Sequence, residues 1–191
     1  MGNLRVYVAA SALEIERARA AMAALRAAGV RVTSTWIASI EAAGASNPRD
    51  ASPEQRRAWS MSDLAEIRAA DVLWLLAPAA TAPTRGAWTE LGFMYALGRR
   101  IVCSGDTRQS IFCALGEEYD SDEHALAAIV ELACVADPSA APIHVDEIEA
   151  AKHRLRAGPF AAVYPEDIAR AKERAVAEPE ELERKLEEQG E

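Results

Sequence analysis

The residues with the clearest chemical potential are two carboxylates, Glu90 and Asp63, which belong to separate segments of the chain. Glu90 lies in the stretch APAATAPTRGAWTELGFMYALG, where an apolar run gives way to a loop and then to a helical pattern. We expect Gly86 to let the backbone turn tightly, with Glu90 in or near the first turn of the helix. The free N–H groups and partial positive charge of a helix N-terminus would keep this carboxylate ionised. Glu90 is therefore a candidate nucleophile or charge-stabilising group.

Asp63 belongs to a segment of helical period, residues 53–70, whose apolar face is formed by Leu64, Ile67 and Ala70. We expect Asp63 beside that face, towards the end of the helix that is nearer a ligand crevice. Each carboxylate also has a simpler interpretation. Asp63 would be a surface group paired with Arg56 or Arg57, and Glu90 an ordinary helix-start glutamate favoured by the helix dipole.

The elements that must position these carboxylates follow from the apolar pattern. Short apolar runs at 4–10, 30–35, 71–76 and 99–104 predict buried strands, and 110–115 is a further short piece. Helical patterns alternate with them at 11–28, 53–70, 86–98 and 121–136. This order predicts an α/β fold of flavodoxin-like or Rossmann-like type, a doubly wound parallel sheet of about five strands. In such sheets ligands bind beyond the carboxyl ends of the strands.

Composition bounds the rest of the interpretation. The 191 residues suit one α/β domain at 1–136, followed by a charge-rich helical C-terminal extension at 137–191. A formal net charge of −9 disfavours nucleic acid as a partner. Three cysteines and three histidines, without a C-x-x-C pair, indicate neither a disulfide framework nor a metal site. No signal peptide or membrane-spanning run is evident, so we expect a cytoplasmic protein without membrane contact.

Two motifs together resemble a known family. The first is D-L-x-x-I-x-x-A-D-V, starting at Asp63, and the second is T-R-G-A-W-T-E-L-G-F-M-Y-A-L-G-R-R-I-V, starting at Thr84. Their combination is similar to the nucleoside 2-deoxyribosyltransferase family, which includes 2′-deoxynucleoside 5′-monophosphate N-glycosidases and CMP N-glycosidases. The resemblance covers roughly residues 4–134 in element order and is most specific over 63–104.

The resemblance implies an enzyme that cleaves or transfers an N-glycosidic bond of a nucleoside or nucleotide. Glu90 matches the nucleophile that attacks the anomeric carbon. Asp63 matches the carboxylate that holds sugar hydroxyls and assists proton transfer to the leaving base, and Tyr7 matches a tyrosine that positions the nucleophile. A plain aromatic core residue is the alternative for Tyr7. Two carboxylates are a sufficient set for a reaction with an oxocarbenium-like transition state, so no cofactor or metal is expected.

The substrate-binding residues expected from this comparison surround the two carboxylates. Family members that use nucleosides carry an acidic residue six positions before the nucleophile, where this chain has Thr84 followed by Arg85. A hydroxyl and a guanidinium suit a 5′-phosphate, although a solvated loop arginine is the alternative for Arg85. The full set of predicted binding residues has three parts. Ser11 would donate a hydrogen bond to the phosphate, Trp36 and Trp88 would stack on the base, and the loop residues are Thr84, Arg85 and Gly86.

Other functions fit the same fold. A binding module that senses a nucleotide without turnover would use the same crevice. Cytokinin-activating phosphoribohydrolases share a similar fold, but their P-G-G-x-G-T-x-x-E loop is absent here. The sequence leaves open hydrolysis or transfer, the base, and ribose or deoxyribose. Because members of the resembled family are commonly oligomeric, we expect a homodimer or a larger homo-oligomer.

Overall fold

A sheet of five parallel strands organises the part of the chain that the computed structural model describes, residues 4–44, 51–78 and 85–136. The strands are β1 (Arg5–Ala9), β2 (Arg31–Val32), β3 (Val72–Ala77), β4 (Arg100–Gly105) and β5 (Glu117–Tyr119). Their order, β2-β1-β3-β4-β5, is that of a flavodoxin-like doubly wound sheet, as predicted. The described residues all fall within one compact unit, Met1–Leu155. The predicted C-terminal extension at 137–191 lies outside them.

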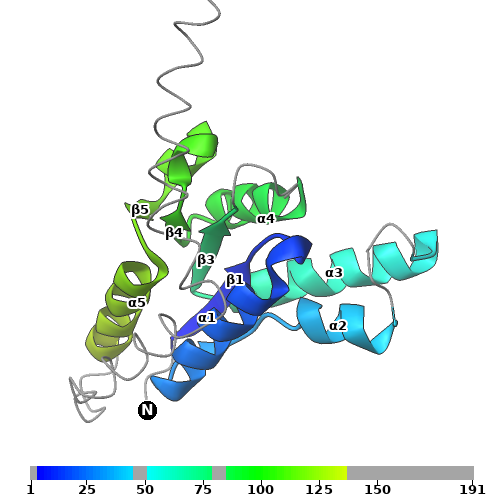
Figure 1. Ribbon diagram of the computed structural model, residues 1–191, viewed down its shortest axis with the longest axis horizontal. Coiled ribbons are helices and arrows are strands. Elements are labelled where there is room, and N and C mark those ends of the chain that lie inside the picture. The colour runs from blue at the N-terminus through cyan, green and yellow to red at the C-terminus, as the bar shows by residue number, and fades with distance from the viewer. Residues whose placement is uncertain (1–3, 45–50, 79–84, 137–191) are drawn as a thin grey trace, which may run out of the picture. The chain divides into compact units, whose positions relative to one another are not determined.

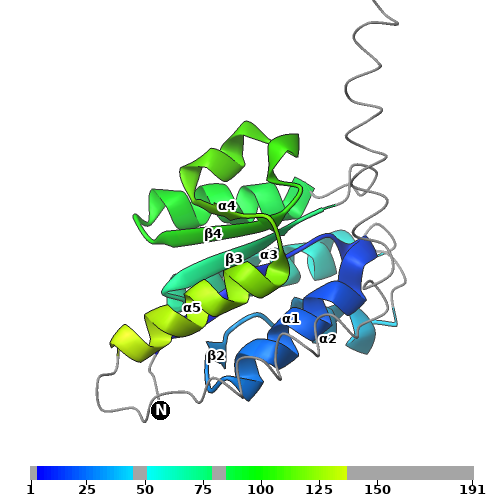
Figure 2. The same cartoon turned by 60° about the vertical axis from the view of Figure 1, so that its left-hand side comes forward.

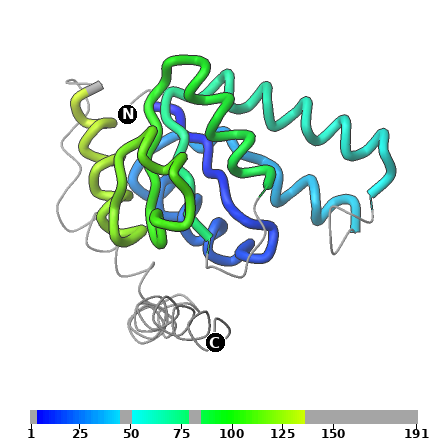
Figure 3. The backbone as a smooth tube through the Cα atoms, turned by 90° about the horizontal axis from the view of Figure 1, so that it is seen from above, coloured from blue at the N-terminus to red at the C-terminus, as the bar shows by residue number. Residues whose placement is uncertain are grey.

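Helices cover both faces of the sheet. They are α1 (Ile15–Ala27), preceded by the 3-10 turn η1 (Ala12–Glu14), then α2 (Trp36–Ala42), α3 (Pro53–Ala69), α4 (Arg85–Ala96) and α5 (Asp122–Ala136). Helices α1 and α5 lie on one face, and α3 and α4 lie on the other (Figures 1 and 2). Helix α2 lies beside α3 (Figure 3). The candidate carboxylates therefore belong to the two helices of one face.

The ends of α3 follow from local sequence signals. The Ser52 hydroxyl accepts a hydrogen bond from the backbone N–H of Gln55, and the Gln55 side chain accepts one from the backbone N–H of Ser52. Pro53, which cannot donate at the first helical position, fixes the start of the helix. At the other end Asp71, which follows the helix, accepts hydrogen bonds from Arg5, at 2.7 Å to the nearest guanidinium nitrogen, and this ion pair ties it to β1.

Two sequence predictions about elements are wrong. The sequence pattern predicts a polar loop at residues 41–53, but the first two belong to α2, a short helix that the apolar pattern does not predict and whose buried side chains are Ile37 and Ile40. Residues 111–115 form a 3-10 helix, η4 (Ile111–Leu115), which follows η3 (Thr107–Gln109) and is capped by the Ser110 hydroxyl. The fifth strand comes later, at Glu117–Tyr119. This edge strand is short and polar, so the search for apolar runs does not predict it.

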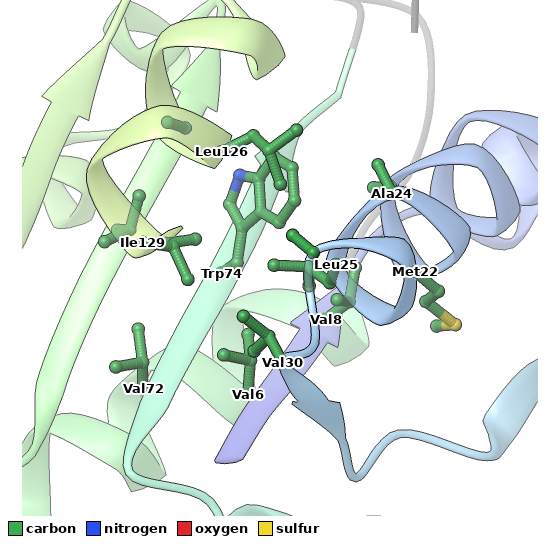
Figure 4. Packing of buried hydrophobic residues seen from close by; sticks show 14 of the residues in the cluster. Val6, Val8, Met22, Ala24, Leu25, Val30, Val72, Trp74, Leu126 and Ile129 are labelled. Atoms are coloured by element: carbon green, nitrogen blue, oxygen red, sulfur yellow. The ribbon is translucent and has the colours of Figure 1, made fainter. Parts of the chain in front are cut away.

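The core is divided by the sheet into two layers because successive strand residues point to opposite faces. Val6 and Val8 of β1 pack with α1 and α5, whereas Tyr7 and Ala9 pack with α3 and α4. Trp74 fills the first layer between Leu25 of α1 and the side chains of α5, and it is fully buried (Figure 4). The second layer places Tyr7 beneath the helices that carry the candidate carboxylates.

A buried arginine, which the sequence does not single out, ties the carboxyl ends of two strands to two helices. Arg17 of α1 donates to the backbone oxygen of Ala77 at 2.7 Å and to both carboxyl oxygens of Asp122 at 2.7 and 2.8 Å. Its side chain is only 3% exposed. Gly105 has a φ of 94°, and a Cβ atom there would lie 2.7 Å from the guanidinium. The close approach of β4 to Arg17 therefore requires glycine.

We predict that Arg17→Met costs about 3–5 kcal/mol of unfolding free energy, because it leaves the Asp122 carboxylate buried with the Ser104 hydroxyl but without its ion-pair partner. Arg19→Met is the matched control on the same helix. Arg19 pairs with Glu16 and Glu41 at the surface, where its loss costs at most about 1 kcal/mol. Urea unfolding of the whole chain measures both variants. Equal losses in the two variants would contradict a structural role for the Arg17 network.

Candidate active site

Tyr7 and Glu90 meet on the α3/α4 face of the sheet. The Tyr7 hydroxyl donates a hydrogen bond to Oε1 of Glu90 at 3.0 Å, joining the middle of β1 to α4. Tyr7 is fully buried, and this burial, together with the charges of Glu90 and Asp63, raises the pKa of its hydroxyl far above the ordinary value. Tyr7 is thus both a core residue and a permanent donor to the Glu90 carboxyl group.

Asp63 is the second carboxylate of this site. It lies on α3, is partly buried, and makes no hydrogen bond or ion pair with another residue of the described ranges, Arg56 and Arg57 included. Burial, followed by the charge of Glu66, raises the pKa of Asp63 to about 6. The charge of Asp63 acts in turn on both Glu90 and Tyr7, and its carboxyl group has no hydrogen-bond or ion-pair partner among the described residues.

The expectation that Glu90 is kept ionised by the helix N-terminus is wrong for the free protein. Glu90 lies five residues after the start of α4, in its second turn, where the helix dipole has little effect. Burial and the negative charge of Asp63 raise the pKa of Glu90 to about 8, although the hydrogen bond from Tyr7 opposes this shift. Desolvation and like charge therefore outweigh the favourable donor.

The two carboxyl groups consequently lose their protons at different pH values. With pKa values of about 6 and about 8, the Asp63–Glu90 pair holds one proton over the intervening pH range. Both groups are protonated at lower pH and both are ionised at higher pH. A site with one carboxylate and one carboxylic acid at neutral pH contains a nucleophile or base together with an acid.

Sequence reasoning missed Glu66, a third carboxylate at this site. It follows Asp63 by three residues on α3 and accepts hydrogen bonds from the backbone N–H and the hydroxyl of Thr35. Its charge also raises the pKa of Glu90. The three-residue spacing from Asp63 was the available signal, because residues three apart share a helix face.

The predicted base-stacking and phosphate-binding residues of the N-terminal half have structural partners. Trp36 begins α2, is half-buried, and donates from its indole Nε1 to the backbone oxygen of Val8 at 3.0 Å. Ser11 is buried and caps η1, where its hydroxyl accepts a hydrogen bond from the backbone N–H of Leu13 at 3.2 Å. Both residues lie after the carboxyl ends of their strands, the edge where ligands bind in this fold.

The start of α4 differs from its prediction. Gly86 is the second residue of the helix and has no positive φ, so it does not make the expected tight turn. Arg85 and Gly86 are exposed. Trp88 is half-buried and packs against the α3/α4 layer of the core. Thr84 lies outside the described residues. Within them, no side-chain hydrogen bond or ion pair joins Arg85 or Trp88 to Asp63 or Glu90.

Metal-binding clusters and membrane-spanning helices are not found in the part of the chain that the structure describes. It contains no group of three or more His, Cys, Asp or Glu side chains arranged to hold a metal ion. None of its helices is both long and apolar enough to span a bilayer.

Comparison with known proteins defines the class to which this fold and site belong. The model of the nucleoside 2-deoxyribosyltransferase family matches residues 6–131, about two thirds of the chain and all of the sheet except Arg5, so the protein belongs to this family. Among solved structures, it is similar to a CMP N-glycosidase, BcmB, of Clostridium botulinum. The identity is 18%, the TM-score is 0.42, and the match covers 65% of this chain and 97% of that one. No curated protein matches the chain.

The raised pKa of Glu90 predicts a pH-dependent cost to folding. Glutamate in the unfolded chain ionises near 4.5, but Glu90 in the folded protein ionises near 8, so stability falls as the pH rises between these values. We predict that Glu90→Gln raises the melting temperature at pH 8 and changes it little at pH 4. Thermal unfolding across this pH range measures the difference.

Glu131→Gln is the control, because Glu131 is exposed on α5, which covers the other face of the sheet. It should leave the slope of melting temperature against pH unchanged. A Glu90→Gln variant that is less stable than the wild type at pH 8, or equally stabilised at both pH values, would show that Glu90 is not buried against like charge.

Proposed function

We propose that this protein cleaves or transfers the N-glycosidic bond of a nucleoside or nucleotide, with Glu90 as the nucleophile. Membership of the nucleoside 2-deoxyribosyltransferase family supports the reaction class. The observation that carries the residue assignment is the convergence of Tyr7, Asp63 and Glu90 from three different elements. A carboxylate beside the anomeric carbon and an acid for the departing base are what this reaction requires.

The proposed reaction has two displacements at the anomeric carbon C1′. In the first, the Glu90 carboxylate forms a bond to C1′ while the bond from C1′ to the base nitrogen breaks and Asp63 supplies a proton to the base. In the second, water or another base attacks C1′ and displaces Glu90, and Asp63 takes the proton released by the attacking group. Hydrolysis and transfer differ only in this second acceptor.

The position of the shared proton matters for the first step. The higher pKa of Glu90 places the proton mainly on Glu90 in the free protein, whereas attack requires it on Asp63. The Tyr7 hydroxyl favours this exchange because its hydrogen bond stabilises the ionised form of Glu90. The positive charge that develops on the sugar in the transition state favours it as well.

For the substrate, we propose a nucleotide with a 5′-phosphate that is bound at the start of α4. Arg85 is exposed at the first residue of this helix, where a guanidinium and the helix N-terminus both favour an anion. The contribution of Thr84 is part of the same proposal, as are Ser11 for the phosphate and Trp36 and Trp88 for the base. The choice between ribose and deoxyribose stays open.

The remaining expectations also stand as proposals. We propose a cytoplasmic protein with a catalytic domain at 1–136 and an extension at 137–191. We also propose a homodimer or larger homo-oligomer. In support of an assembly, Ile111 and Phe112 of η4 and Tyr95 of α4 expose large apolar side chains that a second copy would cover.

Release of free base from a panel of nucleosides and 5′-monophosphates tests the proposed function. We predict release by the wild type, a loss of about a thousandfold or more in Glu90→Gln, and a loss of roughly 10²–10⁴-fold in Asp63→Asn. Tyr7→Phe should lose about tenfold or more, because it removes a hydrogen bond to a charged group. Glu131→Gln on α5 should retain full activity.

Two outcomes would contradict the enzyme assignment. Nucleotide-dependent stabilisation in thermal unfolding without any base release would favour a module that binds nucleotides and leaves them intact. Absence of both stabilisation and release would exclude the proposed ligand class. Addition of a second free base distinguishes transfer from hydrolysis, since only transfer yields a new nucleoside.

A further inference from the structure

Glu66 is held firmly by the protein, although it lies beside the two candidate catalytic carboxylates. Its Oε2 accepts a hydrogen bond from the backbone N–H of Thr35 at 2.9 Å, and its Oε1 accepts one from the Thr35 hydroxyl. Ser62 donates to the same Oε1 at 3.3 Å. Both carboxyl oxygens therefore have protein donors, in contrast to Asp63, which has none among the described residues.

The segment that holds Glu66 is itself anchored to the sheet. Thr35 precedes Trp36, the first residue of α2, and the Trp36 indole donates to the backbone oxygen of Val8 in β1. Glu66 thus links α3 to the β2–α2 connection, and that connection is tied to the strand that carries Tyr7. This arrangement fixes the position of the Glu66 charge relative to Tyr7 and Asp63.

The charged and titratable groups on the elements packed against α3 do not neutralise Glu66. On β1 they are Tyr7 and Arg5, which pairs with Asp71, and on α4 they are Arg85, Glu90 and Tyr95. On α2 the group is Glu41, which pairs with Arg19 of α1. On α3 itself, the guanidinium of Arg68 lies over the Phe93 ring, 5.3 Å from its centroid. No ion pair within the described ranges includes Asp63, Glu66 or Glu90.

The electrostatic effect of Glu66 reaches all three groups of the candidate site. Its negative charge contributes to the raised pKa values of Asp63, Glu90 and Tyr7. For Asp63 it is the largest cause after burial. Glu66 is therefore held in one position by hydrogen bonds, and its charge makes Tyr7, Asp63 and Glu90 each harder to deprotonate.

We propose that Glu66 is a positioning residue of the active site, a fixed negative charge held by Thr35 that retains one proton on the Asp63–Glu90 pair at neutral pH. This proposal rests on the proposed function for its catalytic meaning. When the bond from C1′ to nitrogen breaks, its electron pair goes to the base, and the retained proton neutralises that charge. In this role Glu66 acts through Asp63 and Glu90 and not by contact with the sugar or the base.

The pH profile of kcat/KM for base release by the whole protein tests this role. We expect Glu66→Gln to move the alkaline limb, where the pair loses its last proton, to lower pH by about one unit, the size expected for removal of a nearby like charge. The amide oxygen introduced by this substitution would still accept a hydrogen bond from Thr35. Glu54→Gln is the control on the same helix, about 18 Å away along its axis, and should leave the profile in place.

A merely structural role gives a different profile. If Glu66 only docks α2 onto α3, then Glu66→Gln lowers kcat/KM by the same factor at every pH and leaves both limbs where they are. That result overturns the proposal. A shift of the alkaline limb to higher pH overturns it as well.

A second measurement separates this inference from the proposed function because it needs no activity. If the Glu66 charge opposes ionisation of Glu90, the gain in melting temperature from Glu90→Gln at pH 8 will be smaller in a Glu66→Gln background than in the wild type. An equal gain in both backgrounds overturns the role of Glu66, whether or not the protein releases base. A smaller gain in melting temperature, found in a protein that releases no base, supports the role of Glu66 and contradicts the proposed reaction.

Discussion

The hydrogen bond from the Tyr7 hydroxyl to the Glu90 carboxyl group is the contact on which the candidate site depends. It holds a helix residue of α4 against the middle of the central strand β1, next to Asp63 of α3. In this position Glu90 is partly buried and lies close to the negative charge of Asp63, which together raise its pKa to about 8. The contact therefore fixes both where the carboxyl group lies and how readily it loses its proton.

The fold divides its two tasks between the faces of the sheet. On the α1/α5 face, Trp74, Arg17 and Asp122 form a packed and hydrogen-bonded layer that stabilises the strand ends. On the α3/α4 face, the carboxyl groups of Asp63 and Glu90 are brought together at a cost to stability, as the direction of both pKa shifts requires. Such a cost is common where a site must be ready for a charged transition state.

Sequence reasoning predicted the parts of this molecule that depend on local pattern. The continuous apolar run of β3, the helical pattern of α3 and the family motifs around Asp63 and Glu90 are all visible in short windows of sequence. The Thr35–Glu66 contact joins residues 31 apart and the Arg17–Asp122 contact joins residues 105 apart. Neither contact can be predicted from a short stretch of sequence. The pKa of Glu90 was predicted in the wrong direction because burial and neighbouring charge arise only from tertiary packing.

The proposed chemistry depends on one physical condition, that Asp63 and Glu90 share a space in which only one of them readily ionises. The most direct test is a ¹³C NMR titration of the Glu90 side-chain carboxyl carbon in the wild type and in Asp63→Asn. We predict a wild-type midpoint near pH 8 that falls when Asp63 loses its charge. A midpoint near the ordinary value of 4.5, unmoved by Asp63→Asn, would contradict this condition.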